Sequence, residues 1–221
     1  MSSSKRGAFS AVIFDLDGTL LNTLEDLADS VNFALGQFGF PPRTYGEVRD
    51  FVGNGVSNLV RRSLPGGQKT PEFEDVLALF RRHYSENCRS KTRPYGGILE
   101  LLRALSGAGI KMAVVSNKYD AAVKELVRLY FGDLIPVAIG ESEKARRKPA
   151  PDTVLSALAQ LGAAAEGAVY VGDSEVDLQT AKNAGLPCIT VTWGFRDKAS
   201  LAAAGAETMV DSVTELLRAL I

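Results

Sequence analysis

The hydrophobic pattern of the chain changes in character at Gly96. Beyond it, short apolar runs alternate with longer stretches whose apolar residues recur at helical spacing, and glycines close several of these stretches. The apolar runs predict strands over 110–115, 135–139, 168–171, 188–192 and 208–210. The helical stretches predict helices over 98–105, 121–129, 153–161 and 178–184, a short helix near 199 and a terminal helix from 213. This alternation predicts an α/β fold with a mainly parallel sheet that helices cover on both faces.

The segment before this alternation has two parts. The uncharged run 11–14 predicts a buried strand of the same sheet. From 21 to 89 the apolar residues form helical stripes separated by breaks that contain proline or glycine, and no strand is expected there. We therefore predict a core of residues 1–20 and 90–221, interrupted by a small helical cap over 21–89. Both ends of the insertion should return close to the end of the first strand, so the cap is expected to act as a lid.

Composition narrows the function classes further. The chain has 221 residues, of which 46% are hydrophobic and 23% charged, and this balance is ordinary for a soluble globular protein. A formal net charge of −1 gives no electrostatic reason to expect a nucleic acid or an acidic membrane surface as partner. Cys88 and Cys188 are expected to be small apolar side chains rather than a disulfide or zinc ligands. Residues 1–6 lack the apolar stretch of a signal peptide, and a cytoplasmic location is expected.

Two acidic residues follow the first strand directly. Asp15 and Asp17 are spaced i, i+2, so they would share one face of a continuing strand, and Gly18 turns the chain behind them. The carboxyl ends of strands are where open α/β sheets bind their ligands. Like charges held this close call for a cation, a shared proton or both. The alternative is a strand-ending turn in which Thr19 caps the next helix.

Later strands also lead into polar residues. Ser116 and Asn117 follow the strand at 110–115, where a hydroxyl, an amide and the amino end of a helix would suit phosphate oxygens. An ordinary helix cap is the alternative there. The strand at 168–171 leads into Asp173 and Asp177. Acids and phosphate-binding groups at one sheet edge predict a magnesium-assisted phosphate site, because Mg²⁺ takes hard oxygen ligands.

Lys148 is the candidate cation of this site. It stands just before a proline-containing helix entrance that would fix its position. The basic neighbours Lys144, Arg146 and Arg147 also fit a solvated basic run, so both interpretations stay open for Lys148.

These motifs, taken together, resemble those of the haloacid dehalogenase superfamily. The likeness consists of the Asp15–Thr19 segment, Ser116, Lys148 and the acidic segment 172–177, in this order and at suitable separations. It covers nearly the whole chain. The resemblance implies a Rossmann-like core with a helical cap inserted after the first motif.

The same resemblance implies a role for each residue. Asp15 would attack phosphorus to give an aspartyl-phosphate, and Asp17 would protonate the leaving oxygen and then take a proton from water. Mg²⁺ would be held by the Asp15 carboxylate, the Asp17 backbone carbonyl and Asp173. The resemblance implies that the phosphoryl group is bound by Ser116, Asn117, Lys148, Gly18 and Thr19. It also implies that Asp177 supports these residues.

Within the superfamily, the segments 51–56, 93–95 and 191–196 resemble the bacterial phosphoglycolate phosphatases. This likeness implies hydrolysis of 2-phosphoglycolate. The turn Gly53-Asn54-Gly55 could present backbone N–H groups to a carboxylate, or could simply break a helix. Basic residues that could pair with such a carboxylate are Arg49, Arg61, Arg62 and Lys118.

Other functions remain open at this point. A pyrophosphatase, a sugar-phosphate phosphatase or a phosphosugar mutase of the superfamily would share the core motifs, because cap residues choose the substrate. A non-catalytic regulator that binds a phosphorylated metabolite would be expected to lack a core residue, and none of the motif positions is missing. We expect a small phosphorylated metabolite as partner, no nucleic acid or membrane, and a monomer or homodimer.

Overall fold

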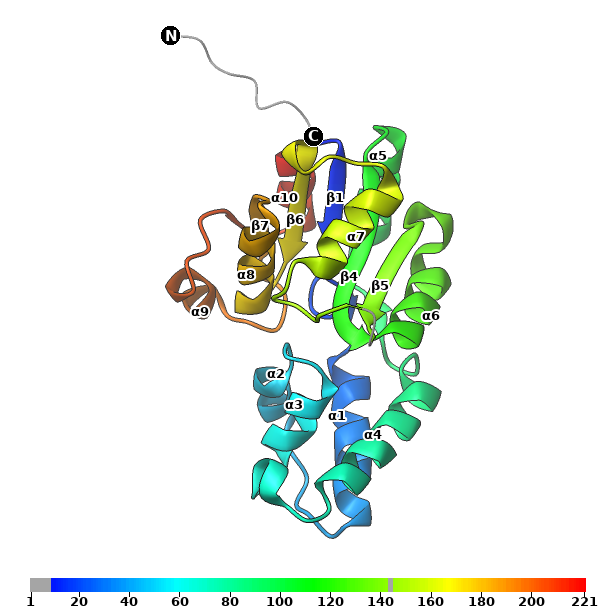
Figure 1. The fold of residues 1–221 in the computed structure, drawn as a ribbon, viewed down its shortest axis with the longest axis vertical. Helices are drawn as coiled ribbons and strands as arrows, with labels where there is room; N and C mark the ends of the chain where they lie inside the picture. Colours follow the sequence, from blue (N-terminus) through cyan, green and yellow to red (C-terminus); the bar gives the residue numbers. More distant parts are fainter. Residues whose placement is uncertain (1–8, 143–144) are drawn as a thin grey trace.

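A computed structural model describes residues 9–142 and 145–221 of the chain. Residues 1–6, where no signal peptide is expected, and Lys144 of the basic run lie outside the described residues. The described chain forms an α/β core with a group of helices beside one end of its sheet (Figure 1).

The core is a six-stranded sheet in the order β5-β4-β1-β6-β7-β8, and all of its pairings are parallel. Its strands are β1 (Ala11–Phe14), β4 (Lys111–Tyr119), β5 (Val137–Glu141), β6 (Ala168–Gly172), β7 (Cys188–Val191) and β8 (Met209–Val210). The chain builds outward from β1 through β4 to β5, then crosses to β6 on the other side. The point where the strand order reverses therefore lies beside β1, and ligands of open α/β sheets bind at such a point.

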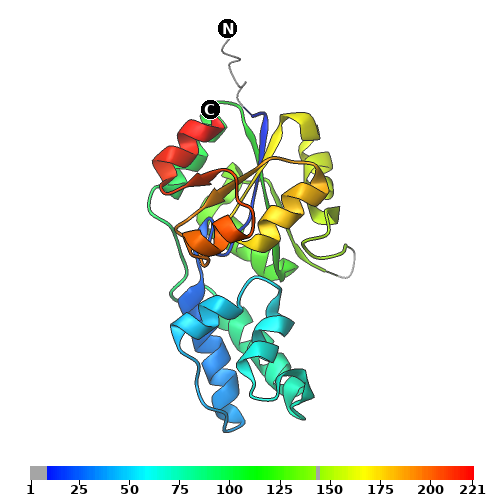
Figure 2. The same cartoon turned by 90° about the vertical axis from the view of Figure 1, so that its left-hand side faces the viewer.

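The two-residue period of β1 explains the layers of the core. Val12 and Phe14 join one fully buried cluster, whereas Ala11 and Ile13 join a second one on the opposite face. The first face packs against α5 (Ile98–Gly107), α6 (Asp120–Phe131) and α10 (Val213–Leu220). The second packs against α7 (Asp152–Leu161) and α8 (Glu175–Ala184), and Figure 2 shows these helices on either side of the sheet. The predicted α/β fold with a mainly parallel sheet is confirmed.

The remaining short elements connect this framework. They are α9 (Lys198–Ala203) and the 3₁₀ turns η1 (Gly67–Lys69), η2 (Gly132–Leu134) and η3 (Ala165–Gly167). No helix of the described segments has the length and apolar character needed to cross a membrane.

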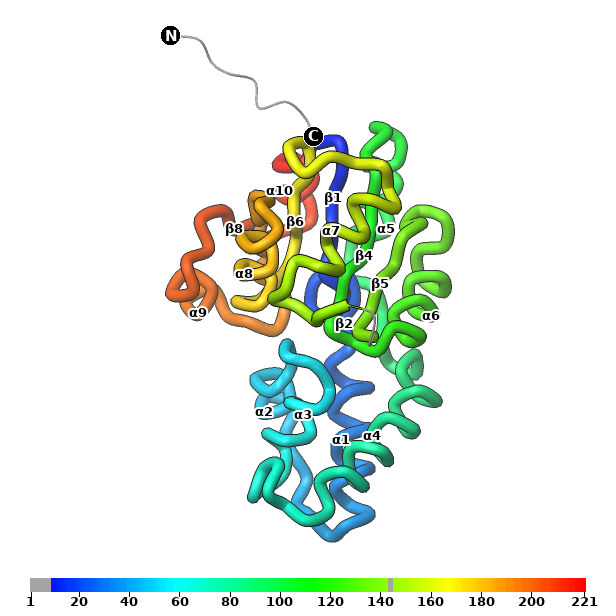
Figure 3. The backbone as a smooth tube through the Cα atoms, viewed as in Figure 1, coloured from blue at the N-terminus to red at the C-terminus, as the bar shows by residue number. Residues whose placement is uncertain are grey.

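Four helices follow β1 in the chain and pack against one another. They are α1 (Leu24–Gln37), α2 (Tyr45–Phe51), α3 (Val56–Ser63) and α4 (Phe73–Asn87). Their group lies below the carboxyl ends of the core strands in Figure 3. We refer to α1–α4 as the cap; its boundaries at 21 and 89 stay a prediction.

Two local expectations were wrong. The stretch 21–89 does contain a strand, β2 (Leu21–Asn22), which pairs antiparallel with β3 (Arg93–Pro94) where the chain leaves and re-enters the core. A strand of two residues is too short to show an alternating pattern. β4 also continues to Tyr119 instead of ending at 115, so Ser116 and Asn117 lie on a strand and not at the amino end of a helix.

Candidate active site

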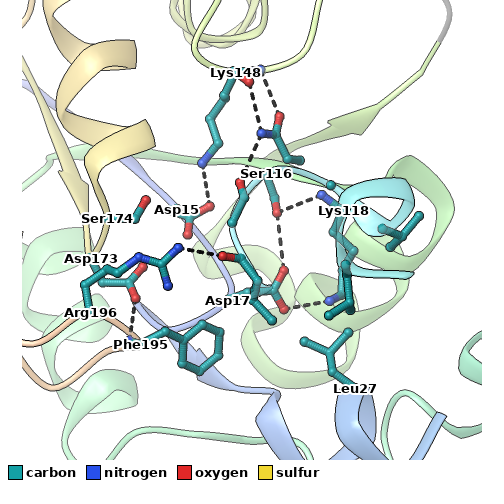
Figure 4. A pocket seen from close by; sticks show the side chains of 16 residues that line it. Asp15, Asp17, Leu27, Ser116, Lys118, Lys148, Asp173, Ser174, Phe195 and Arg196 are labelled. Carbon is teal, nitrogen blue, oxygen red and sulfur yellow. Dashed lines mark hydrogen bonds and ion pairs between the residues drawn. The ribbon is translucent and has the colours of Figure 1, made fainter. Parts of the chain in front are cut away.

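The end of β1 places the two leading acids at the point where the strand order reverses. The Asp15 backbone N–H donates to the Val171 carbonyl at 2.8 Å, which continues the ladder to β6 beyond the last strand residue. Gly18 then takes a φ of 89°, and its N–H donates to the Leu21 carbonyl at 2.9 Å. Beside this turn, the Asp15 carboxylate meets Lys148 and the Asp17 carboxylate meets Lys118 (Figure 4).

Three buried carboxylates meet beside this turn. One oxygen from each of Asp15, Asp173 and Asp177 lies within 4.8 Å of the other two. Asp173 follows β6, where Thr19 Oγ1 donates to its Oδ1 at 3.3 Å and the Phe195 N–H donates to its Oδ2 at 2.7 Å. The two acids after separate strands therefore converge as the sequence predicts, and Asp177 joins them from the first turn of α8.

Lys148 lies against this cluster with only 4% of its surface exposed. Its Nζ donates to Asp15 Oδ1 at 2.7 Å and to Asp177 Oδ1 at 2.8 Å. Tyr170 Oη lies 3.0 Å from the same nitrogen and donates to Asp177 Oδ1. Asn117 fixes the backbone of Lys148 from β4, since its Oδ1 accepts from the Lys148 N–H at 2.8 Å and its Nδ2 donates to the Lys148 carbonyl. Lys148 is thus a buried member of the site and not part of a solvated run.

Burial and mutual repulsion dominate the titration of the cluster. Burial raises the pKa of Asp15 to about 7, although the Lys148 ammonium opposes the shift. Burial, followed by the charges of Asp177 and Asp15, raises the pKa of Asp173 well above its ordinary value. Burial would lower the pKa of Lys148, but the two carboxylates that it contacts raise it instead. Lys148 is therefore a cation at neutral pH.

The donor set fits a divalent cation. Lys148 supplies one positive charge against the three carboxylates of Asp15, Asp173 and Asp177. A bound cation would supply the missing charge, and carboxylate oxygens are the ligands that hard divalent cations prefer. The carboxylates of Asp15 and Asp173 would hold the metal, which when bound would neutralise the acids and the oxygens of an anionic ligand.

Asp17 belongs to a second buried network. Its Oδ1 accepts from Lys118 Nζ and from Thr23 Oγ1, both at 2.6 Å, and its Oδ2 lies 3.4 Å from Ser116 Oγ. Lys118 Nζ lies 4.7 Å from the centre of the Tyr84 ring, which comes from α4 of the cap. Burial would lower the pKa of Lys118, but the Asp17 carboxylate raises it above its ordinary value. The Asp17–Lys118 pair is thus an ion pair inside the pocket.

The pocket itself lies between core and cap. Its cap side is formed by Leu27, Val52, Gly53, Gly55, Val56 and Leu59, and Figure 4 shows the core residues opposite. Arg196, from the loop after β7, spans the two parts. It donates to Glu175 Oε2 at 2.9 Å, to the Val52 carbonyl at 2.7 Å and to the Arg49 carbonyl at 3.2 Å. The guanidinium of Arg196 therefore ties the end of α2 to the core.

Not every predicted site residue lines the pocket. Gly53 and Gly55 do, whereas Asn54 and Arg49 are absent from its lining in the described part of the chain. The Arg49 side chain is 52% exposed, with its Nε 3.7 Å from Asp50 Oδ1. The roles assigned to the core and cap residues stay predictions.

Sequence reasoning missed Tyr170 and Arg196, and it did not place Lys118 beside Asp17. In the sequence Tyr170 looks like an apolar strand residue, although the alternation of β6 places it on the face of α8. The sequence indicates Lys118 only as one of several basic residues that could pair with a carboxylate. Arg196 lies in a loop without periodicity, so no local signal marks its reach to the cap.

Buried acids and a buried lysine beside a pocket at the carboxyl ends of parallel strands are the groups that an α/β enzyme hydrolysing phosphate esters requires. A family model described as haloacid dehalogenase-like hydrolase matches residues 12–191, and the chain belongs to this family.

The proteins to which this chain is similar include several described as phosphoglycolate phosphatases. The chain is 36% identical over 209 residues to a plasmid-encoded phosphoglycolate phosphatase of Cupriavidus necator, covering 93% of this chain and 90% of the relative. It is 35% identical over 212 residues to a phosphoglycolate phosphatase of Pseudomonas putida, covering 93% and 78% of the two chains. A solved structure of a candidate phosphoglycolate phosphatase from Lactobacillus delbrueckii subsp. bulgaricus superposes with a TM-score of 0.93 at 36% identity, covering 97% and 99%.

Proposed function

We propose that this protein is a Mg²⁺-dependent phosphatase that hydrolyses 2-phosphoglycolate to glycolate and phosphate through an aspartyl-phosphate on Asp15. The observation that carries the proposal is the convergence of Asp15, Asp173, Asp177 and Lys148 at one sheet edge. Family membership supports the hydrolytic class, and the names of the relatives support the substrate.

The chain's own residues account for the proposed steps. Asp15 attacks phosphorus while Lys148 balances charge on the acids and on the phosphoryl oxygens. Asp17 must be protonated when the ester bond breaks; it gives this proton to the departing ester oxygen, so that glycolate leaves with a hydroxyl group. Asp17 then takes a proton from water as the water oxygen attacks the aspartyl-phosphate, and the P–O bond to Asp15 breaks. Phosphate and the free Asp15 carboxylate result.

Mg²⁺ is the proposed metal, and its proposed ligands are the carboxylates of Asp15 and Asp173 and the backbone carbonyl of Asp17. Buried carboxylates without sulfur or imidazole partners in the described cluster support a hard cation of this kind. The metal would neutralise charge that Lys148 alone leaves unbalanced.

The pocket supports a small substrate. Its cap wall carries the apolar side chains Leu27, Val52, Val56 and Leu59, which offer nothing to the hydroxyls of a sugar. A cytoplasmic location and a monomeric or homodimeric state stay proposals from the sequence; the two cysteines are free thiols, which suits a reducing compartment.

A panel of phosphate esters tests the proposal. With Mg²⁺, kcat/KM is expected to be highest for 2-phosphoglycolate among 2-phosphoglycolate, sugar phosphates and pyrophosphate. EDTA and Asp15→Asn should each abolish turnover of every compound. A higher kcat/KM for a sugar phosphate or pyrophosphate would reject 2-phosphoglycolate as the substrate. Binding of these esters without turnover would favour a non-catalytic regulator.

A further inference from the structure

The free end of the substrate needs a binding group, and this pocket offers few. Three cationic side chains line it in the described chain: Lys118, Lys148 and Arg196. Resting on the proposed function, we propose that Lys118 binds the carboxylate of the substrate and thereby selects small acidic phosphate esters.

The strand geometry of β4 brings Lys118 to the right place. β4 continues through Tyr119, although its pairing with β5 is irregular between Val115 and Tyr119, and it carries both Ser116 and Lys118. Both contact Asp17, with Lys118 Nζ at 2.6 Å and Ser116 Oγ at 3.4 Å from its two oxygens. A residue that contacts the acid for the leaving oxygen lies beside the leaving group.

The other two cations are committed elsewhere. Lys148 donates to Asp15 and Asp177 at the phosphoryl end of the site. Arg196 donates its N–H groups to Glu175 and to carbonyls at the end of α2. Lys118 has three N–H donors, and its one carboxylate contact in the described structure is Asp17. It can therefore donate to a second carboxylate without releasing the first.

The length of 2-phosphoglycolate matches this spacing. A single methylene separates its ester oxygen from its carboxylate, so a group that lies beside the leaving oxygen also lies beside the carboxylate. The neighbouring cap side chains Leu27 and Leu59 are apolar, so they offer no hydrogen bond to a leaving group that lacks a carboxylate. Lys118 itself is only 5% exposed, and a carboxylate that meets a desolvated ammonium interacts strongly with it.

The test compares two substrates of equal length, 2-phosphoglycolate and 2-hydroxyethyl phosphate, in which a hydroxymethyl group replaces the carboxylate. In the wild type, kcat/KM should favour 2-phosphoglycolate. Lys118→Met should lower this preference by about tenfold to a hundredfold, the range expected for loss of a hydrogen bond between charged groups. Turnover of 2-hydroxyethyl phosphate serves as the internal control for folding of the variant. Lys124→Met, on the exposed face of α6, should leave the preference unchanged.

The outcomes separate the inference from the proposed function. A wild type without Mg²⁺-dependent turnover of either ester overturns both, and so does a wild type that does not distinguish them. A wild-type preference that survives in Lys118→Met overturns the inference alone.

A second measurement does not depend on the folding of that variant. A crystal structure of Asp15→Asn with 2-phosphoglycolate should show Lys118 Nζ within hydrogen-bond distance of the bound carboxylate. A carboxylate held instead by the Gly53–Gly55 turn or by Arg196 would overturn the assignment.

Discussion

Gly18 and Asp173 pack against each other so closely that no side chain fits at position 18. A Cβ built on Gly18 would overlap the carboxylate of Asp173, and the φ of 89° at Gly18 is one that residues with a side chain rarely adopt. Gly194 approaches the same carboxylate with the same lack of space. Asp173 is therefore held in place by two glycines that lie far from it in sequence.

Gly18→Ala is expected to reduce kcat/KM at least a hundredfold, because the new methyl group must displace Asp173 from the carboxylate cluster. The increase in melting temperature on adding Mg²⁺ should also shrink. Gly39→Ala is the matched control, since Gly39 has a φ of 71° with open space around its missing Cβ. It should lose about 1 kcal/mol of stability from backbone strain and keep full activity. Equal activities of the two variants would contradict the prediction.

Metal binding should stabilise the protein more at high pH than at low pH. The folded-state pKa of Asp15 is about 7, above its ordinary value of 3.8, and that of Asp173 is raised in the same direction. Between pH 3.8 and about 7 the folded protein keeps a proton on Asp15 that the unfolded chain has lost. The stability that comes from this proton is therefore lost as the pH rises through 7. A divalent cation needs the ionised carboxylates and should restore stability there.

Thermal unfolding with EDTA or with Mg²⁺ at pH 5 and pH 8 checks this. The shift in melting temperature caused by Mg²⁺ should be larger at pH 8, and Asp15→Asn should weaken its dependence on pH. A shift of equal size at both pH values would count against a metal site built on these acids.

Part of this site could be predicted from the sequence because its signals are local. The uncharged run before Asp15 and the turn at Gly18 identify a strand end without any knowledge of the rest of the chain. The apolar period predicts the beginning of α8 at 178, whereas the helix begins at Glu175, because its acidic first turn carries few apolar residues.

The rest of the site depends on contacts between distant segments. Ser116, Asn117 and Lys118 are polar enough to indicate a turn, yet they extend β4 because Asp17, in the turn after β1, and Lys148 satisfy their side chains. No local pattern carries this information. The contacts of the site, and not the intrinsic strand propensity of these residues, explain why polar residues occupy strand positions here.

Arg196 should control how firmly the cap rests on the core. Its bonds to the Val52 and Arg49 carbonyls cross between the two parts, and the Glu175 carboxylate orients its guanidinium. Arg196→Ala is expected to increase amide hydrogen exchange over 52–55 and to raise KM several-fold. Glu175→Gln keeps the bonds to the carbonyls and should have a smaller effect on both. Unchanged exchange in Arg196→Ala would show that other contacts hold the cap.

Tyr170 should act on Lys148 without touching the substrate. Its hydroxyl lies 3.0 Å from Lys148 Nζ and 2.9 Å from Asp177 Oδ1. Tyr170→Phe removes both bonds but leaves Lys148 with its two carboxylates, so kcat is expected to fall about threefold to tenfold with little change in KM. Stability should fall by about 1–2 kcal/mol, the usual cost of losing buried hydrogen bonds. Tyr119→Phe, at a 65% exposed position, is the control and should change neither.

Asp26 should determine the stability of the junction between cap and core. Its carboxylate is 3% exposed and accepts hydrogen bonds from the backbone N–H groups of Lys91 and Thr92, where the chain returns from the cap. Asp26→Ala leaves these donors without their partner and is expected to cost about 2–4 kcal/mol in the free energy of unfolding. Asp29→Ala removes a carboxylate from the same helix whose contacts, with the Lys91 ammonium at 2.7 Å and the Tyr45 hydroxyl at 3.4 Å, are exposed, and it should cost less than about 1 kcal/mol. Denaturant unfolding of both variants measures the difference. Similar losses would mean that the charge on α1, and not the anchoring of the returning backbone, stabilises this junction.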